Sequence, residues 1–347
     1  MTRAPPLVTL AAFVGLLAVP NSVAAQPAIG LSAFHKADGI PQPHLLAARR
    51  LAAGENFWKV PILNVCYRED SGLSQVIIKD PPPTAVADNL YFLGTGEWSA
   101  WALRTPGGIV VIDTLNNADE AETYIAGGLR KVGLDPNDIK VIFVSHGHGD
   151  HYGGAQYLHD KYGAKIYMGA DDVAYATKRA ATTTPNRPTG PVPHIDVPTR
   201  DGDSLTLGGV TLKVFLTPGH TPGTQSLLIP FKYKGKDEIA AFHGGVTSSN
   251  DFTPQAHAAF DQSIDRFIRA AQAAHATAYM ANHGAFDDTA RKVAHIRAFP
   301  QDEPNDFVVG EASTIRWLNI VKECNLNNRD VDAVFAARGM KVSAAGR

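Results

Sequence analysis

A cluster of metal-ligand side chains follows an apolar run near the middle of the chain. The run Ile139–Val144 leads through Ser145 into the segment His146-Gly147-His148-Gly149-Asp150-His151. Imidazole and carboxylate groups at this spacing suit zinc, which takes nitrogen and oxygen ligands about 2.0–2.2 Å away in a roughly tetrahedral shell. The alternative of four surface polar residues in a turn is disfavoured, because chance rarely places three histidines and an aspartate after a buried strand. The glycines predict a sharply turning, non-helical segment.

Two later histidines also follow predicted strands. His220 lies in the Pro- and Gly-rich segment Thr217–Gly223, and His283 lies in Ala281-Asn282-His283-Gly284. Loops that follow strands can meet at one edge of the sheets, so we expect these ligands to converge. The six divide into two sets of three: His146, His148 and His220, and Asp150, His151 and His283. Each set would hold one zinc ion, two per chain, with an open position for water.

Apolar runs and helical spacings on either side of these segments predict strands that alternate with helices. A buried sheet covered by helices in one domain is the expected arrangement. Residues 181–200 are rich in proline and form either a solvated connector or a flap at the mouth of the site. Trp98 is expected to form an apolar wall and Trp101 to fill the core. The predicted strands are 89–94, 99–103, 109–113, 139–144, 165–168, 203–207, 211–216, 225–230, 238–242 and 277–281, and the predicted helices are 119–131, 152–162, 171–180, 261–274 and 289–297.

The first 25 residues have the pattern of a cleavable signal peptide. One basic residue precedes the apolar run Leu7–Val19, and small residues end at Ala25. This run is short for a membrane span, although an uncleaved anchor is the alternative. We expect cleavage near Ala25 and a periplasmic or secreted protein without stable membrane insertion. Residues 26–85 are interpreted as an N-terminal extension and 86–347 as the main domain with a C-terminal helical extension, in which Trp317–Asn325 has helical apolar spacing.

Charge and cysteine content narrow the range of partners. The chain of 347 residues is 44% hydrophobic, and its 32 basic and 34 acidic side chains are scattered without long runs of one sign. A net charge of −2 disfavours nucleic acid, so we expect a small-molecule substrate. Cys66 and Cys324 are too few for a cysteine zinc site, and either a disulfide or two buried thiols is compatible with the sequence. The oligomeric state is left open.

The His-x-His-x-Asp-His segment with its later histidines resembles the metallo-β-lactamase superfamily over about residues 86–300. The resemblance implies an α/β (α+β) fold, a four-layer αββα sandwich, and a metal-dependent hydrolase. It also implies that Asp113, at the end of a predicted strand, supports the metal loop through hydrogen bonds rather than binding metal.

One sequence difference from other branches of that superfamily indicates which subclass the chain resembles most. Glyoxalases, lactonases and RNA-processing members have a Gly-Asp pair after the later strand, whereas this chain reads Phe242-His243-Gly244-Gly245-Val246. The missing bridging aspartate makes the chain most similar to subclass B3 metallo-β-lactamases. In that subclass hydroxyl residues just beyond this strand bind the substrate carboxylate, which implies Thr247 or Ser248 here. Gly245 lacks the hydroxyl expected at one of those positions, and His243 is interpreted as structural.

These features together predict a two-zinc hydrolase that opens the amide bond of β-lactam antibiotics through a metal-bound hydroxide. Asp150 would orient the nucleophile while ligating the second metal. One alternative is an exported lactonase or esterase of the same fold. Another is a non-catalytic zinc-binding module, which open coordination positions disfavour because structural zinc normally has four protein ligands.

Overall fold

Two β-sheets face each other in the computed structural model, which describes residues 40–53, 62, 65–66, 80–182, 188–248, 253–300 and 305–338. The first sheet has seven strands in the order β1 to β7, and the second has five in the order β12-β11-β10-β9-β8. The strands of the first sheet are Thr84–Ala85, Leu90–Phe92, Trp101–Thr105, Gly108–Ile112, Ile139–Val144, Lys165–Gly169 and Val197–Thr199. Those of the second are Ser204–Leu207, Val210–Leu216, Gln225–Tyr233, Lys236–His243 and Ala278–Ala281.

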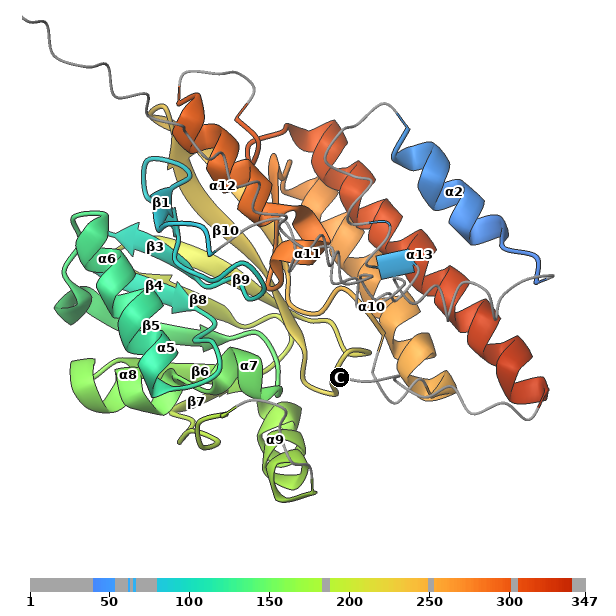
Figure 1. The fold of residues 1–347 in the computed structure, drawn as a ribbon, viewed down its shortest axis with the longest axis horizontal. Coiled ribbons are helices and arrows are strands. Elements are labelled where there is room, and N and C mark those ends of the chain that lie inside the picture. The colour runs from blue at the N-terminus through green and yellow to red at the C-terminus, as the bar shows by residue number, and fades with distance from the viewer. Residues whose placement is uncertain are drawn as a thin grey trace, which may run out of the picture.

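Helices cover the outer face of each sheet (Figure 1). Beside the first sheet lie α5, α6 and α8, and beside the second lie α10, α13 and, outermost, α2. The helices are α2 (Pro43–Leu51), α5 (Ala118–Glu120), a π-helical turn (Ala121–Ala126), α6 (Gly127–Lys131), a 3-10 turn (Pro136–Asp138), α7 (Gly149–Tyr152), α8 (Ala155–Tyr162), α9 (Ala170–Thr182), α10 (Pro254–Ala273), α11 (Gly284–Asp287), α12 (Thr289–Ala298) and α13 (Glu311–Ala337).

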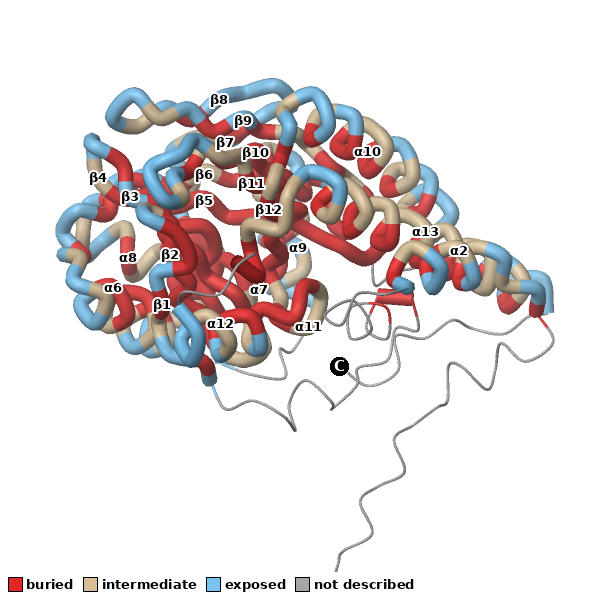
Figure 2. Tube along the Cα trace, turned by 90° about the horizontal axis from the view of Figure 1, so that it is seen from above, coloured by how far each residue is buried: buried red, intermediate tan, exposed pale blue. Residues whose placement is uncertain are grey.

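Side chains that point alternately to the two faces of each strand form three apolar layers, which confirms the αββα sandwich. On β4, Val110 and Ile112 face the layer between the sheets, whereas Ile109 and Val111 pack against the helices beside the first sheet. Side chains of β10 and β11 likewise divide between the middle layer and the layer under α10 and α13. Figure 2 shows the buried segments concentrated on the central strands and the exposed ones along the outer helices and β8.

The structure corrects three local expectations. Gly149–Tyr152, expected to be part of a non-helical turn as far as His151, forms the short helix α7. Its N-cap residue is His148, whose backbone is extended, so the turn is confined to the residues before it. Val197–Thr199, expected to be loop, forms β7 and pairs with β6 at the edge of the first sheet. The C-terminal helix is much longer than its apolar stretch at Trp317–Asn325 indicated, since α13 spans Glu311–Ala337.

The N-terminal segment packs on the outer helical layer rather than on the site. Leu45 and Ala48 of α2 belong to the same apolar layer as Trp317 of α13. Cys66 and Cys324 form a disulfide, which decides between the two states that the sequence left open. The expected signal peptide, residues 1–25, lies outside the described residues. Among the helices of the described part, none has the length and apolarity needed to cross a membrane.

Candidate metal centre

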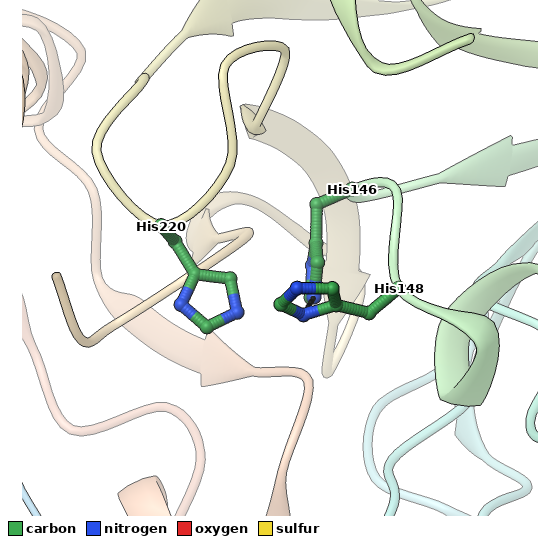
Figure 3. Close-up of side chains that lie close together, drawn as sticks. All are labelled: His146, His148 and His220. Atoms are coloured by element: carbon green, nitrogen blue, oxygen red, sulfur yellow. Dashed lines mark hydrogen bonds between the residues drawn. The ribbon is translucent and has the colours of Figure 1, made fainter. Parts of the chain in front are cut away.

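The three ligand-bearing segments meet at one edge of the sandwich. His146 to His151 follow β5, His220 lies in the turn between β9 and β10, and His283 follows β12. The side chains group into two sets, His146, His148 and His220, and Asp150, His151 and His283, whose ligand atoms lie within 4.8 Å of one another in each set. Figure 3 shows the three rings of the first set pointing toward a common point from two different loops. The structure therefore brings together the predicted ligands in the predicted division.

Hydrogen bonds fix the orientation of each ring in the first set. The Nδ1 atom of His146 donates to the carbonyl of Gly244 at 2.8 Å, which leaves Nε2 3.1 Å from Nδ1 of His148. The other nitrogen of His148 lies 3.0 Å from the hydroxyl of Tyr175. His220 donates from Nδ1 to the carbonyl of Thr247 at 2.9 Å. One nitrogen per ring thus has a protein partner, and the other is left for the shared centre.

The second set combines a carboxylate with two imidazoles. Nε2 of His151 is 3.1 Å from Nε2 of His283 and 3.3 Å from Oδ2 of Asp150. Nδ1 of His151 donates to Asp113 at 2.9 Å, so one nitrogen of this ring is held by Asp113 and the other faces the ligands of the second set. His151 is buried, whereas the side chains of Asp150 and His283 are 27% and 23% exposed. Solvent therefore reaches the centre from the side of the second set.

The arrangement fits divalent zinc. Ligands about 2.0–2.1 Å from a tetrahedral ion lie about 3.3 Å from one another, close to the separations given above. Burial, followed by the neighbouring histidines, holds the pKa of both His146 and His148 well below its usual value, so these rings are neutral and able to ligate. Burial opposes the charge on His151, yet Asp150 and Asp113 raise the pKa of that ring to about 10. Metal binding at the second set therefore releases a proton.

Asp113 lies beneath the metal loop, where the resemblance had implied a supporting role. Its Oδ1 accepts the backbone N–H of Ser145 at 2.7 Å, and its Oδ2 accepts both the Ser145 hydroxyl and His151. Asn282, next to His283, donates at 2.7 Å to the same Gly244 carbonyl that orients His146. These bonds tie the ends of β4, β5, β11 and β12 together under the ligands.

Trp98 contributes a polar contact that the sequence did not indicate. Its indole Nε1 donates at 3.0 Å to Oδ2 of Asp150, the oxygen that faces His151 and His283. Trp98 also forms an isolated β-bridge with His283, so one segment positions two ligands of the second set. The expectation of a purely apolar wall was therefore incomplete. Trp101 is fully buried in the middle layer, as expected.

The last residue of β11 is His243, which Gly244 and Gly245 follow, and its ring packs against core side chains. His243 is fully buried, and its ring packs 5.7 Å from Phe260 and 5.6 Å from Phe267. Burial, together with nearby His220, lowers the pKa of His243 to about 3, so it is neutral. Its Nδ1 accepts the N–H of Gly245 at 3.3 Å.

The two hydroxyl residues beyond β11 differ in accessibility. The carbonyl of Thr247 orients His220, and its side chain lies beside the same ring, with Oγ1 3.3 Å from Nδ1. Thr247 is 8% exposed and Ser248 only 1% exposed. The N–H of Ser248 donates to Asn325 of α13 at 2.7 Å, which holds this residue against the helical layer. Thr247 is therefore the better placed of the two to meet a substrate.

Comparison with known proteins agrees with this geometry. Residues 94–232 match the family model described as the metallo-beta-lactamase superfamily. This match confirms the resemblance to that superfamily over the part of the chain that carries the metal-ligand loop. Among solved structures, FEZ-1 from Legionella gormanii has a TM-score of 0.61 at 21% identity over 76% of this chain and 99% of its own. BJP-1, a subclass B3 enzyme of Bradyrhizobium japonicum, has a TM-score of 0.60 at 24% identity over 77% and 98%.

Curated relatives of this chain match over shorter segments. A hydroxyacylglutathione hydrolase of Rhodopseudomonas palustris is 32% identical over 133 residues, which cover 38% of this chain and 42% of that protein. An uncharacterized protein of Mycobacterium leprae is 35% identical over 114 residues, covering 28% and 49%. The chain thus spans less than half the length of these relatives. Superfamily members are metal-dependent hydrolases, and the His-rich centre of this chain offers the ligand types that such a centre needs.

Gly245 illustrates how tightly the candidate metal centre is packed. A Cβ at this position would lie 2.6 Å from Cβ and 2.8 Å from Cγ of His220. Overpacking of this kind costs about 1–3 kcal/mol, so we expect Gly245→Ser to weaken metal binding at the first set by roughly 5- to 150-fold. Zinc titration of the purified variant measures this. Gly245→Ala is the matched control, because it adds the Cβ without a hydroxyl and should weaken binding similarly. Full zinc affinity in both variants would contradict the prediction.

Proposed function

We propose that this protein is an exported two-zinc hydrolase that opens the amide bond of β-lactams, similar to subclass B3 metallo-β-lactamases. One observation carries the proposal: two complete three-ligand sets meet at one edge while His243-Gly244-Gly245 stands where a bridging carboxylate would follow β11. The two metallo-β-lactamase structures compared above, one of them from a subclass B3 enzyme, support it at the level of architecture.

The residues of the chain have distinct roles in this proposal. Zinc bound at such sites lowers the pKa of a water molecule and polarises the carbonyl that the water attacks. Asp150 is the proposed catalytic residue, since its partly exposed carboxylate can hold the attacking water while Trp98 fixes one of its oxygens. Thr247 is proposed to donate to the substrate carboxylate from beside His220, with Ser248 as a buried neighbour. Asp113 accepts a hydrogen bond from Nδ1 of His151 and so holds that ring in its orientation.

A second hydrolytic activity is favoured by a different observation. The curated relatives that match at 32% identity include hydroxyacylglutathione hydrolases, so a thioester or lactone substrate is the alternative. A non-catalytic zinc module is disfavoured, because each set offers three protein ligands where structural zinc normally has four.

Hydrolysis assays of the mature chain test the proposal. A carbapenem and a chromogenic cephalosporin would be compared with a hydroxyacylglutathione thioester and an acyl-lactone, each with chelator and with zinc restored. We expect turnover of both β-lactams that chelator abolishes and zinc recovers. Zinc-loaded protein that hydrolyses only the thioester or lactone would replace the proposed substrate, and zinc loading without any turnover would favour the non-catalytic module.

Export is proposed on two grounds. The first 25 residues have the composition of a signal peptide, and the Cys66–Cys324 disulfide is typical of oxidising compartments. Periplasmic or secreted location is tested by the N-terminal sequence of the protein recovered from the producing cell, which we expect to begin near Gln26.

A further inference from the structure

A buried carboxylate outside the ligand sets connects the two loops that carry the first set. Asp172, in the first turn of α9, is 0% exposed. Its Oδ2 accepts the N–H of Gly147 at 2.7 Å and the hydroxyl of Thr221 at 2.6 Å, and its Oδ1 accepts the N–H of Gly223 at 2.7 Å. Gly147 lies between His146 and His148, and Thr221 directly follows His220.

These three bonds join parts of the molecule that belong to different sheets. The loop with His146 and His148 follows β5 of the first sheet, whereas the turn with His220 connects β9 and β10 of the second. Gln225 links the strand ends below, through its N–H to Ser145 and its side chain to Val144. Asp172 is thus the group that joins the loops themselves, beyond the ends of the strands.

The backbone of Gly223 packs directly against Asp172. A Cβ at Gly223 would lie 2.5 Å from the Asp172 nitrogen and 2.9 Å from its Cβ. Burial raises the pKa of Asp172 to about 6, so the carboxyl is mostly ionised at pH 7 and can accept all three donors. A charged acceptor in this setting forms strong hydrogen bonds.

We propose that Asp172 is a positioning residue that sets the metal affinity of the first ligand set by holding the His146–His148 loop against the His220 turn. The inference rests on the metal-dependent hydrolase proposed above. Among the described residues, Asp172 forms no hydrogen bond to any of the three rings of the first set. It acts through the backbone of Gly147 and Gly223 and the hydroxyl of Thr221. Supporting groups of this kind typically change metal affinity by about 10–100-fold.

Variants that keep only one ligand set test the proposal directly. In full-length mature protein, His283→Ala leaves the first set complete and His220→Ala leaves the second set complete. Zinc dissociation constants would be measured by competition with a chromophoric chelator, with and without Asp172→Asn. Asparagine keeps the size of the side chain but presents an amide NH2 to at least one of the three donors. We expect Asp172→Asn to weaken zinc binding by about 10–100-fold in the His283→Ala protein and to leave the His220→Ala protein unchanged.

A matched control is available at Asp287, which is equally buried and accepts the N–H groups of Ala281 and Thr289. Asp287→Asn should leave zinc binding in the His283→Ala protein unchanged. Equal weakening of both sets by Asp172→Asn, or no weakening of the first set, would overturn the proposal. So would absence of zinc binding in the His283→Ala protein itself, because the first set would then not be a site.

If Asp172→Asn does not fold, variants at Thr221 provide a second test of the proposal. Thr221→Val removes one of the three bonds and should weaken the first set by a smaller factor, while Thr221→Ser retains the hydroxyl and should restore the affinity. Identical zinc affinities for the valine and serine variants would overturn the inference. Zinc binding that follows these expectations in a protein without β-lactam turnover would contradict the proposed substrate and still support the role of Asp172.

Discussion

Replacing His220 with alanine is expected to remove one of two zinc ions and to lower kcat/KM by at least about 10³. His220 is the one ligand of the first set that lies outside the His146–His148 loop, and its ring is fixed by the carbonyl of Thr247. Without it the first set keeps two imidazoles, too few for a stable zinc site. Loss of several kcal/mol of electrostatic stabilisation corresponds to a rate loss of this size, at about 1.4 kcal/mol per factor of ten.

Metal content and kinetics measured on the same preparation check this expectation. Zinc per chain should fall from two to one by elemental analysis, while circular dichroism stays that of the parent. His275→Ala is the matched control, because the His275 side chain is 80% exposed and bonds to Glu311 on the surface. That variant should keep both zinc ions and full activity. A His220→Ala protein with full activity and one zinc ion would show that the second set alone supports hydrolysis and would sink the two-metal proposal.

The six ligands were predictable because of where they stand in the sequence. Each follows a short apolar run, and such runs form strands whose ends meet at one edge of a sheet. His146, His220 and His283 are also flanked by glycine or proline, which ends a strand and leaves the side chain at the junction. Residue type and position were thus sufficient to predict which side chains come together and how they divide into two sets.

Apart from the role of Asp113, which the resemblance implied, the supporting contacts were not predictable, because they join residues far apart in the chain. Trp98 bonds to Asp150, and Asp172 bonds to Thr221. Neither pair has a local sequence pattern, since an indole or a carboxylate looks the same whether it lies on the surface or braces a metal loop. Only the packed sheets and the start of α9 place these groups beside the ligands.

The length of α13 escaped prediction for a related reason. Its buried residues include three asparagines, Asn325, Asn327 and Asn328, which interrupt the apolar spacing expected of a packed helix. Two of these amides bond to backbone groups outside the helix: Asn325 to Val246 and Ser248 beyond β11, and Asn328 to Val65. A helix that binds loops through amides has a buried face that reads as polar in the sequence.

Reduction of the Cys66–Cys324 disulfide is expected to lower the free energy of unfolding by about 2–5 kcal/mol. The bond joins residues 258 positions apart, so its removal frees a long loop in the unfolded chain. In the folded protein the bond fastens the N-terminal segment to α13. Other links between them include the packing of Leu45 and Ala48 in the outer apolar layer, a 2.6 Å ion pair between His44 and Glu323, and the bond from Asn328 to Val65.

Urea unfolding of the mature protein measures this contribution. The reductant should be a phosphine, because dithiols also bind zinc, and free zinc should be kept constant since bound metal stabilises the folded state. Cys66→Ala/Cys324→Ala is the control: it should unfold at the reduced midpoint with or without phosphine. Because the disulfide supplies no ligand to either set, zinc content should stay at two per chain after reduction. A midpoint unchanged by reduction, or two free thiols in the isolated protein, would contradict the prediction and remove one of the two grounds for export.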